Sequence, residues 1–278
     1  MNTTFIDTHC HLNFKRFKKT QEEVILQSTK MGVSTLIVPG TDIPLSQKAV
    51  EIASLHKNIF AAVGIHPHHT FDVTRVTQNV NTDIQELEKL IVHPKVVAVG
   101  EVGLDNHTYE DTKYPDYKIS GAFMEAQKEY FIAQIQLAKK YKKALIIHNR
   151  ETKKDLLSLL DTEWTEEMRF HAVFHCSEPD DELLEYATLH NVFIGIDGDV
   201  TYGGEKAEFA KKIPLDMLVL ETDAPFLLPE PLRTQKLYPN TPANIPLIAQ
   251  CIAKIKNVSI EEVAEATTKN AQRLFNLI

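Results

Sequence analysis

The sequence predicts a (β/α)8 barrel, a ring of parallel strands in which each strand is followed by a helix. The chain has 278 residues, of which 43% are hydrophobic, and barrels of about 250 residues commonly fold as one domain. Short runs rich in valine, isoleucine and leucine, typical of buried parallel strands, occur eight times. Segments with helical spacing separate the runs, and no internal repeat or low-complexity linker divides them. We therefore expect a single α/β domain of the TIM-barrel type over residues 1–278.

Several of the eight expected strands end beside a histidine or an acidic residue. The strands cover Thr4–Asp7, Thr35–Pro39, Phe60–Gly64, Val96–Gly100, Ala144–Ile147, His171–Phe174, Val192–Ile196 and Met217–Leu220. The expected helices cover Glu22–Met31, Leu45–His56, Phe123–Tyr141, Asp155–Leu160, Asp180–His190, Glu205–Lys211, Ala243–Ile255 and Ile260–Phe275. The last helix opens with Ser259 and Glu262, the Ser-x-x-Glu pattern of a capping box.

Two long segments lack helical and strand patterning and are expected to be loops. Asn106–Ser120 follows the fourth strand, and Ala224–Pro246 follows the eighth. The second segment has prolines at positions 225, 229, 231, 239, 242 and 246, which favour an extended strap. Loops that follow the strands of a barrel lie at one end and shape the substrate site.

Composition limits the partners and the compartment. The formal net charge of −8 argues against a large basic surface that grips a long duplex, but not against a small phosphate pocket whose positive charge comes from metal. The apolar runs are far shorter than the ~20 residues of a membrane span. The N-terminus, Met-Asn-Thr-Thr-Phe-Ile-Asp, has no basic start or apolar region of a signal peptide. We expect a cytoplasmic protein without a membrane partner, and the oligomeric state stays open.

The cysteines predict no disulfide framework, because three of them occur at wide spacing. Cys10 and Cys176 lie beside histidines, and on a strand their side chains would face away from those neighbours. We expect them to pack in a reducing compartment.

Histidines and acidic residues at the strand ends indicate a metal site. His9 and His11 are two residues apart, so on a strand both imidazoles point the same way and can bind one ion. Glu101 follows Val-Val-Ala-Val-Gly, and a carboxylate at the tip of so apolar a run is costly to bury unless a cation compensates. Asp105 either orients another ligand or caps a loop.

Three later strand ends offer further ligands. His148 follows Ala-Leu-Ile-Ile, and His175 follows Ala-Val-Phe. Glu221 and Asp223 lie on one face after the eighth strand, and we favour Asp223 because it is nearer the open end. His66 lies after the third strand, where a substrate contact is expected.

Other catalytic motifs do not occur. The chain has no Gly-x4-Gly-Lys phosphate loop, no Gly-x-Ser-x-Gly elbow and no Cys-x2-Cys pair of a structural zinc site.

The ordered set of motifs resembles the TatD family of metal-dependent deoxyribonucleases, within the amidohydrolase superfamily. The motifs are Ile6-Asp-Thr-His-Cys-His11, Gly64-Ile-His-Pro-His68, Gly100-Glu-Val-Gly-Leu-Asp105, His148-Asn-Arg150, His175-Cys, Glu221-Thr-Asp-Ala-Pro225 and Asn270-Ala-Gln-Arg-Leu-Phe275. After the eighth strand this family usually carries Arg-Gly-Lys and then Asn-Glu-Pro. Here Arg233-Thr-Gln-Lys236 and Asn240-Thr-Pro242 stand in those places.

The resemblance implies a site for two divalent ions, Mg²⁺, Mn²⁺ or Zn²⁺. It assigns His9 and His11 to one ion with Asp223, Glu101 to a bridging position, and His148 and His175 to the second ion. Substrate contacts are expected from His66, Arg150 and Arg233.

These residues predict hydrolysis of a phosphodiester by water that the metals activate, with Asp223 as general base and Glu101 at the catalytic centre. The expected partner is DNA, as short or single-stranded ends, because basic residues cluster after the first strand in an otherwise acidic chain. The cluster is Lys15, Arg16, Lys18 and Lys19, and the aromatic side chains that could stack on bases, or else pack, are Phe14, Phe17 and Tyr202.

Two alternatives remain. One is an amidohydrolase that acts on a cyclic amide or a lactone. Several such enzymes carry a carbamylated lysine at the end of the fourth strand, but no lysine occurs between Val96 and Asp105 here. The other is a metal-binding protein without catalysis, which a water-activating carboxylate at Asp223 disfavours. The choice between DNA and RNA, and the identity of the metal, stay open.

Overall fold

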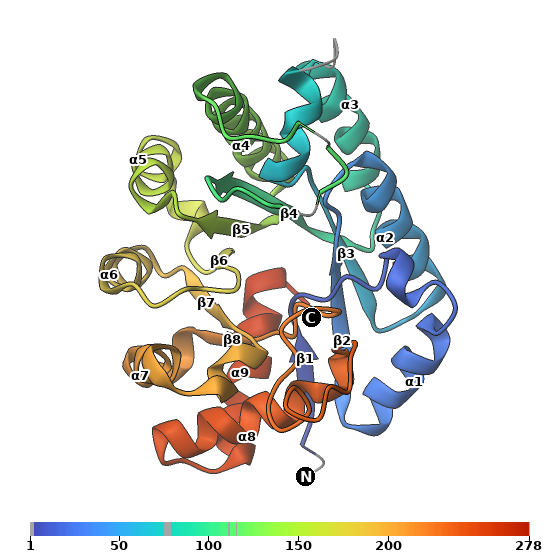
Figure 1. Cartoon of the computed structure of the whole chain (residues 1–278), viewed down its shortest axis with the longest axis vertical. Helices are drawn as coiled ribbons and strands as arrows, with labels where there is room; N and C mark the ends of the chain where they lie inside the picture. The colour runs from blue at the N-terminus through green and yellow to red at the C-terminus, as the bar shows by residue number, and fades with distance from the viewer. Residues whose placement is uncertain (1–2, 75–78, 111, 115, 278) are drawn as a thin grey trace.

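The fold is a (β/α)8 barrel, as the sequence predicts. A computed structural model describes residues 3–74, 79–110, 112–114 and 116–277. The eight strands pair in parallel in the order β1 to β8 and ring a centre that the helices surround (Figure 1). The strands are β1 (Phe5–Asp7), β2 (Val33–Pro39), β3 (Ile59–Val63), β4 (Val96–Asp105), β5 (Ala144–Arg150), β6 (Ala172–Phe174), β7 (Phe193–Ile196) and β8 (Leu218–Leu220).

The ring closes between β8 and β1 just beyond the ends of these two strands. The Thr8 N–H donates to the carbonyl of Leu220 at 3.0 Å, and the Asp223 N–H donates to the carbonyl of His9 at 2.9 Å. A parallel bridge between Cys10 and Ala224 follows. The seam therefore holds together the two segments that carry His9 and Asp223.

Helices cover the outside of the barrel. They are α1 (Gln21–Lys30), α2 (Ile43–Leu55), α3 (Val80–Ile91), α4 (Gly121–Tyr141), α5 (Lys153–Glu163), α6 (Asp181–His190), α7 (Gly204–Lys212), α8 (Ile245–Lys256) and α9 (Ile260–Phe275). Short 3-10 helices occur at Lys15–Phe17, Pro67–Thr74, Glu166–Met168, Gly198–Tyr202, Leu215–Met217 and Pro242–Asn244. No described helix is both long and apolar enough to cross a bilayer.

The predicted elements agree with the observed ones to within three residues at each end, apart from two larger differences. Helix α3 was not predicted, although its buried Val80, Leu87 and Ile91 have helical spacing. Strand β4 continues past Gly100 to Asp105, because its second half pairs with the end of β5. The capping box at the start of α9 is present, with Ser259 and Glu262 in reciprocal hydrogen bonds.

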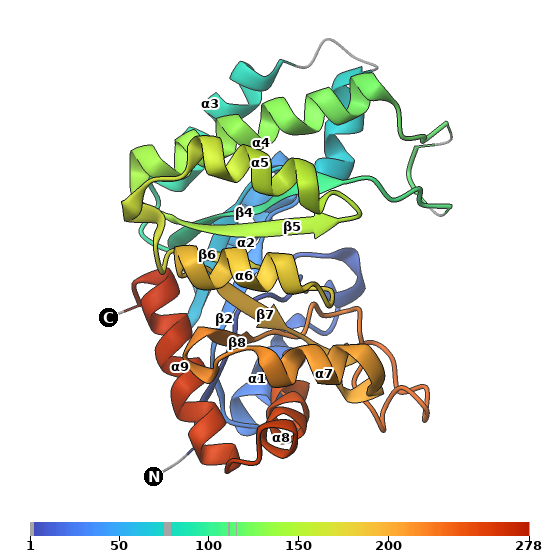
Figure 2. The same cartoon turned by 90° about the vertical axis from the view of Figure 1, so that its left-hand side faces the viewer.

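The strands point toward the end of the barrel where the long loops lie. In Figure 2, the arrows of β5 and β7 run toward the loops that contain residues 106–110, 116–120 and 224–242, and both chain termini lie at the other end. Each strand contributes an apolar side chain to a layer inside the barrel, below the mouth. The layer consists of Ile6, Ile37, Ala62, Ala98, Ala144, Ile146, Val173, Phe193 and Val219, with Leu274 and Phe275 of α9 beneath it.

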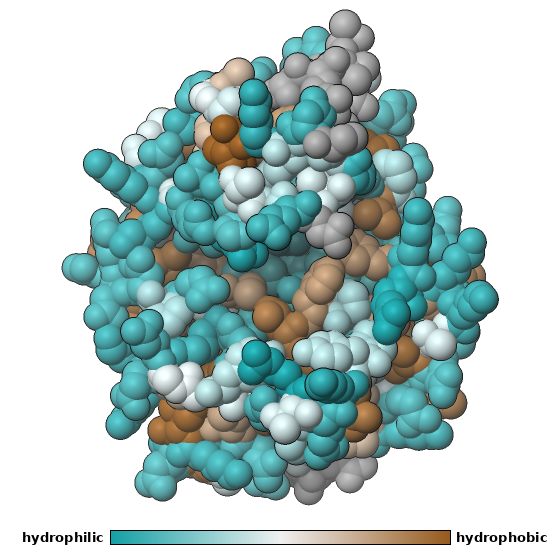
Figure 3. All heavy atoms as spheres, viewed as in Figure 1, coloured by the Kyte–Doolittle hydropathy of each residue, from teal (hydrophilic) through white to brown (hydrophobic). Residues whose placement is uncertain are grey.

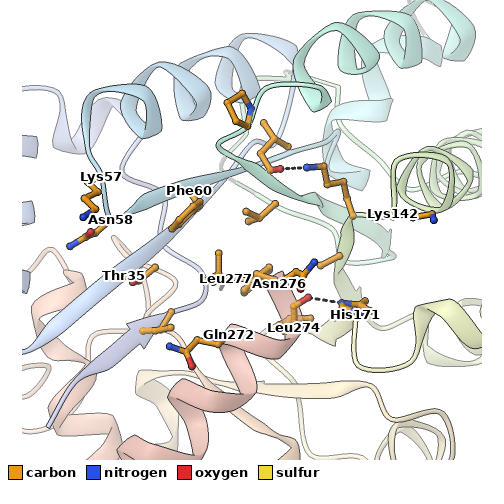
Figure 4. A pocket seen from close by; sticks show the side chains of 17 residues that line it. Thr35, Lys57, Asn58, Phe60, Lys142, His171, Gln272, Leu274, Asn276 and Leu277 are labelled. Carbon is orange, nitrogen blue, oxygen red and sulfur yellow. Dashed lines mark hydrogen bonds between the residues drawn. The ribbon is translucent and has the colours of Figure 1, made fainter. Parts of the chain in front are cut away.

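A separate cavity of about 500 Å³ lies at the end of the barrel where the strands begin (Figure 4). Its lining includes Phe60, His171 and Leu277. The His171 imidazole Nδ1 hydrogen-bonds the carbonyl of Leu274 at 3.1 Å, which ties the end of α9 to the start of β6. None of the predicted metal ligands lines this cavity.

Two buried glutamines on α4 fix the ends of neighbouring strands. The Gln127 amide accepts from the Asp105 N–H at 2.8 Å and donates to the Asp105 carbonyl at 2.8 Å. Two turns later, the Gln134 amide accepts from the Ile65 N–H at 2.7 Å and donates to its carbonyl at 3.1 Å. These bonds satisfy the buried backbone of two segments that lead into the mouth.

We expect Gln127→Leu to lower the free energy of unfolding by about 2–4 kcal/mol, because it leaves the buried N–H and carbonyl of Asp105 without partners. Urea denaturation measures the change. The matched control is Gln136→Leu, an exposed position on the same helix, which should change stability by no more than about 0.5 kcal/mol. Equal effects of the two substitutions would contradict the role of the Gln127 amide.

Candidate metal centre

The six predicted metal ligands lie together at the mouth of the barrel. A cavity of about 540 Å³ opens there, and five of the six line it, while His9 is fully buried beneath. Figure 3 shows the hollow near the middle of this face. The six are His9 and His11 after β1, Glu101 in β4, His148 in β5, His175 after β6 and Asp223 after β8.

One group of donor atoms gathers around the two histidines of the first strand end. The Nε2 atoms of His9 and His11 are 3.2 Å apart, and Glu101 Oε2 lies 3.5 and 3.7 Å from them. Asp223 Oδ1 lies 3.3 Å from His11 Nε2 and 3.8 Å from His9 Nε2. Donors around one tetrahedral ion with bonds of about 2.1 Å stand roughly 3.4 Å apart. His9, His11 and Glu101 therefore have the spacing that a single cation requires, and Asp223 lies beside both histidines.

A second group shares Glu101 with the first. The other carboxylate oxygen, Oε1, lies 2.8 Å from His148 Nδ1 and 3.5 Å from His175 Nε2. Glu101 thus presents one oxygen to each group, and each group could hold a metal ion. Imidazole and carboxylate donors suit Zn²⁺, Mn²⁺, Fe²⁺ or Ni²⁺.

The backbone next to Glu101 is packed so closely that position 100 has room only for glycine. A Cβ atom at Gly100 would lie 2.6 Å from Cβ of Ile146, so glycine lets β4 approach β5. The pairing of these strands shifts register between Val99 and Val102. The Glu101 N–H donates to the carbonyl of Gly40 at 2.8 Å, which fixes the residue between β2 and β5.

Comparison with known proteins agrees with this geometry. The family model described as TatD related DNase matches residues 6–276. The chain belongs to the TatD family.

Similar proteins cover nearly the whole chain. The metal-dependent hydrolase YabD of Bacillus subtilis is 35% identical, with 98% of each chain aligned. The 3'-5' ssDNA/RNA exonuclease TatD of Erwinia tasmaniensis is 33% identical over 98% of this chain and 99% of its own. Among solved structures, the TatD homologue YJJV of Escherichia coli superposes with a TM-score of 0.83 at 27% identity, with 99% of each chain covered. This TatD-family chain is thus a metal-dependent hydrolase with histidine and glutamate clusters able to hold metal.

Carboxylates hold the second ring nitrogen of two of the histidines. His148 Nε2 lies 3.0 Å from Asp105 Oδ2, and the Tyr109 hydroxyl donates to the same oxygen at 2.7 Å. His175 Nδ1 lies 3.1 Å from Glu221 Oε1. Such carboxylates fix the orientation of a metal-binding imidazole and raise its basicity. The geometry therefore gives Asp105 and Glu221 orienting positions, outside the two donor groups that Glu101 joins.

Asp7 supports the site from below, a position that the sequence did not single out. Its carboxylate accepts from the backbone N–H of His9 at 3.2 Å, from that of Thr222 at 3.0 Å, and from the Thr222 hydroxyl at 2.6 Å. Burial raises the pKa of Asp7 to about 8, against the hydrogen bonds from Thr222 and His9, which lower it. The residue ties the end of β1 to the end of β8.

The electrostatics of the centre favour the charged forms of Glu101 and His148 despite burial, whereas burial lowers the pKa of His9 and of His66. Burial alone would raise the pKa of Glu101, but the charges of His66 and His175 and hydrogen bonds with His148 and His9 hold it well below its usual range. Burial would lower the pKa of His148, but Asp105 and Glu101 raise it to about 9.

At His175 and Asp223, too, neighbouring charges outweigh the effect of burial on the pKa. Against burial, the charges of Glu221 and Glu101 raise the pKa of His175 to about 10. The pKa of Asp223 is lowered, because contact with His11 and the charge of His175 outweigh its burial. Without metal, protons on His148 and His175 compensate the carboxylates.

The predicted substrate residues occupy different places. His66 lines the cavity, with Nε2 3.6 Å from Glu101 Oε1. Arg150 lines its rim and donates to the Tyr109 hydroxyl at 3.3 Å. Arg233 is not among the lining residues. Its guanidinium lies 4.1 Å from the ring centre of Tyr202 and 3.7 Å from Glu230.

Several residues that line the metal cavity were not predicted, and two predicted residues differ in exposure from the prediction. Cys10 is fully buried, as expected, but Cys176 is partly exposed and lines the cavity. Strand alternation does not apply to Cys176 because β6 ends at Phe174 and Cys176 has φ of 47°. Phe17, a possible base-stacking residue, is fully buried in the core. Further lining residues that sequence reasoning did not select are Thr41, His69, Tyr109, Asn149, Glu178, Asp199, Phe226 and Leu227.

In metal-free protein, we expect the contribution of His148 and His175 to stability to fall as the pH rises. Their folded-state pKa values of about 9 and about 10 lie above the ordinary 6.5. Their stabilising effect is therefore fully present below pH 6.5 and is lost as the pH passes through these two values. Urea denaturation of chelator-treated protein at increasing pH should reveal a loss of the order of 1–3 kcal/mol. His148→Gln should flatten the profile, and an unchanged slope would contradict the assignment.

Proposed function

We propose that this TatD-family chain is a nuclease that hydrolyses phosphodiester bonds at the ends of single-stranded DNA, with two divalent ions. The observation that carries the proposal is the Glu101 carboxylate, whose two oxygens face two separate groups of donors in one open cavity. A relative that is 33% identical, TatD of Erwinia tasmaniensis, carries the name 3'-5' ssDNA/RNA exonuclease.

The six mouth residues would hold the ions in two groups. His9, His11 and Asp223 would bind one ion, His148 and His175 would bind the other, and Glu101 would bridge them. When bound, Mg²⁺, Mn²⁺ or Zn²⁺ lowers the pKa of a coordinated water and offsets charge on phosphate oxygens.

Asp223 would accept the proton of the attacking water. Its side chain is 15% exposed, the largest exposed fraction among the three residues of the first ligand group, so it can contact both the cavity and the donors. Its lowered pKa keeps the carboxylate ionised at neutral pH, ready to take a proton. Glu221, the alternative from the sequence, is only 1% exposed and already engages His175.

His66 and Arg150 would bind the phosphate. His66 is close to Glu101 and also lines the cavity, and Arg150 adds a permanent positive charge at the rim. Arg233 lies on the strap outside the cavity, so we assign it to a phosphate farther along the strand.

The cavity size favours a strand end over a duplex. A volume of about 540 Å³ is that of a small-molecule pocket, large enough for one nucleotide. The net charge of −8 gives no broad basic surface for wrapped duplex. A single strand that enters by its end needs only local positive charge.

Purified protein with Mg²⁺, Mn²⁺ or Zn²⁺ should shorten an end-labelled single-stranded oligonucleotide, and a chelator should stop the reaction. Gel electrophoresis of products, with duplex and RNA of the same sequence in parallel, measures the preference. If all three substrates survive in every metal while dihydropyrimidine or lactone rings are opened, the amidohydrolase alternative is correct instead.

Asp223→Asn should lower kcat by about 10²- to 10⁴-fold, because the amide cannot accept the proton of water. Metal content, measured by elemental analysis, should persist, since the amide oxygen remains a ligand. The matched control is Asp216→Asn, at an exposed position ahead of the same strand, which should retain wild-type turnover. Near-wild-type kcat in Asp223→Asn would exclude Asp223 as the base.

A further inference from the structure

A second hollow adjoins the metal cavity and is not used by the chemistry described above. Its volume is about 750 Å³, and its floor and walls come from the loop after β1, the start of α2 and the strap after β8. We call it the strap groove. Its lining residues are Phe14, Lys15, Arg16, Asp42, Pro44, Leu45, Pro225, Phe226, Tyr238 and Pro239.

The strap groove is continuous with the metal cavity. Phe14 and Phe226 line both, and their ring centres are 6.2 Å apart. The Phe14 ring also stacks on the imidazole of His11, at 4.3 Å between ring centres. A molecule held on Phe14 in the groove therefore lies next to a proposed metal ligand.

The groove exposes aromatic surface that the fold does not need to bury. Phe226 is 51% exposed and Tyr238 is 54% exposed, on a chain whose large apolar side chains are mostly internal. Apolar side chains border the hollow on this face in Figure 3. Exposed apolar patches rimmed by charge are typical of binding sites.

The charge at the rim favours an anion. Lys15 and Arg16 line the groove, and Lys18 and Lys19 follow on the same exposed segment. The acidic residue in the lining, Asp42, is occupied as the cap of α2, where it accepts from the Leu45 N–H at 2.8 Å. The partial positive charge of that helix end offsets its charge.

We propose that the strap groove seats an unpaired base of a single-stranded nucleic acid, next to the phosphate that is cleaved. Aromatic faces of Phe226 and Tyr238 contact the base, the prolines and Leu45 form an apolar floor, and Lys15 and Arg16 meet the adjoining phosphate. Stacking on aromatic side chains beside a basic track is how proteins hold single strands without reading sequence. This inference rests on the proposed nuclease function and adds the part that selects unpaired substrate.

The test compares binding and cleavage in Tyr238 variants. Tyr238→Ala should weaken binding of a fluorescent oligothymidylate, measured by anisotropy with chelator present, by about 5- to 100-fold. It should raise KM for that strand in the cleavage assay by a similar factor. Cleavage of bis(p-nitrophenyl) phosphate, a diester without bases, should not change.

Two control variants separate stacking from folding. Tyr238→Phe keeps the aromatic ring and should bind like wild type. Leu237→Ala removes a side chain of similar exposure, 56%, from the same strap but outside the groove lining, and should also bind like wild type. Equal loss on the oligonucleotide and on the small diester, or no loss in Tyr238→Ala, would overturn the proposal.

An oligonucleotide that lacks one base shows which base of the strand the strap groove holds. An abasic residue at one position near the strand end should weaken binding to the wild-type protein as much as Tyr238→Ala weakens binding of the intact strand. With that abasic strand, Tyr238→Ala should cause no additional loss of binding. Tolerance of abasic residues at every position would overturn the groove assignment even if nuclease activity is present. Tight binding that depends on Tyr238, without cleavage in any metal, would instead refute the nuclease function and leave the groove as a strand-binding site.

Discussion

The metal centre depends on how neighbouring positive charge compensates the negative charge of the buried Glu101 carboxylate. Glu101 is only 4% exposed, and imidazole nitrogens of five histidines lie 2.8–3.7 Å from its oxygens. A buried carboxylate is costly unless positive charge lies close to it. Protons on imidazoles or metal ions can supply that charge, but both cannot occupy the same nitrogens. Binding of a metal ion therefore has to displace protons from the imidazoles that are charged in the metal-free protein.

The barrel makes this arrangement possible because β1, β4, β5, β6 and β8 all deliver ligands at the same end of the ring. Asp7 and Thr222 join the ends of β1 and β8, so the ligands farthest apart in sequence become neighbours. Asp105 and Glu221 then orient the imidazoles of the second group. The first group lacks such partners: the Nδ1 atoms of His9 and His11 have no hydrogen-bond partner among the described residues. Ring packing, rather than outer carboxylates, therefore has to orient these two rings: His9 stacks on His175 and His11 on Phe14.

The sequence predicted the barrel and the grouping of the six mouth residues, because ligands at the ends of parallel strands must converge once the strands form a ring. It could not predict Asp7, whose role comes from the seam between the first and last strands. It also missed Cys176, since the alternation rule fails where a strand stops and φ becomes positive. Arg233 follows a family pattern in sequence, but the strap carries it to Tyr202 and away from the cavity. Local periodicity fixes strands and helices, whereas loop paths depend on contacts that only the folded chain defines.

The strap separates what this chain shares with its family from what it changes. Asn240 is fully buried and donates to the carbonyls of Thr222 and Leu227 at 2.9 and 3.2 Å, so it anchors the strap beside Asp223. The segment that departs from the usual Arg-Gly-Lys pattern, from Arg233 to Lys236, is exposed. A buried anchor at one end lets the exposed part vary without moving the metal ligands. A change in the exposed part of the strap can therefore alter the rim of the cavity while the centre that Glu101 organises stays in place.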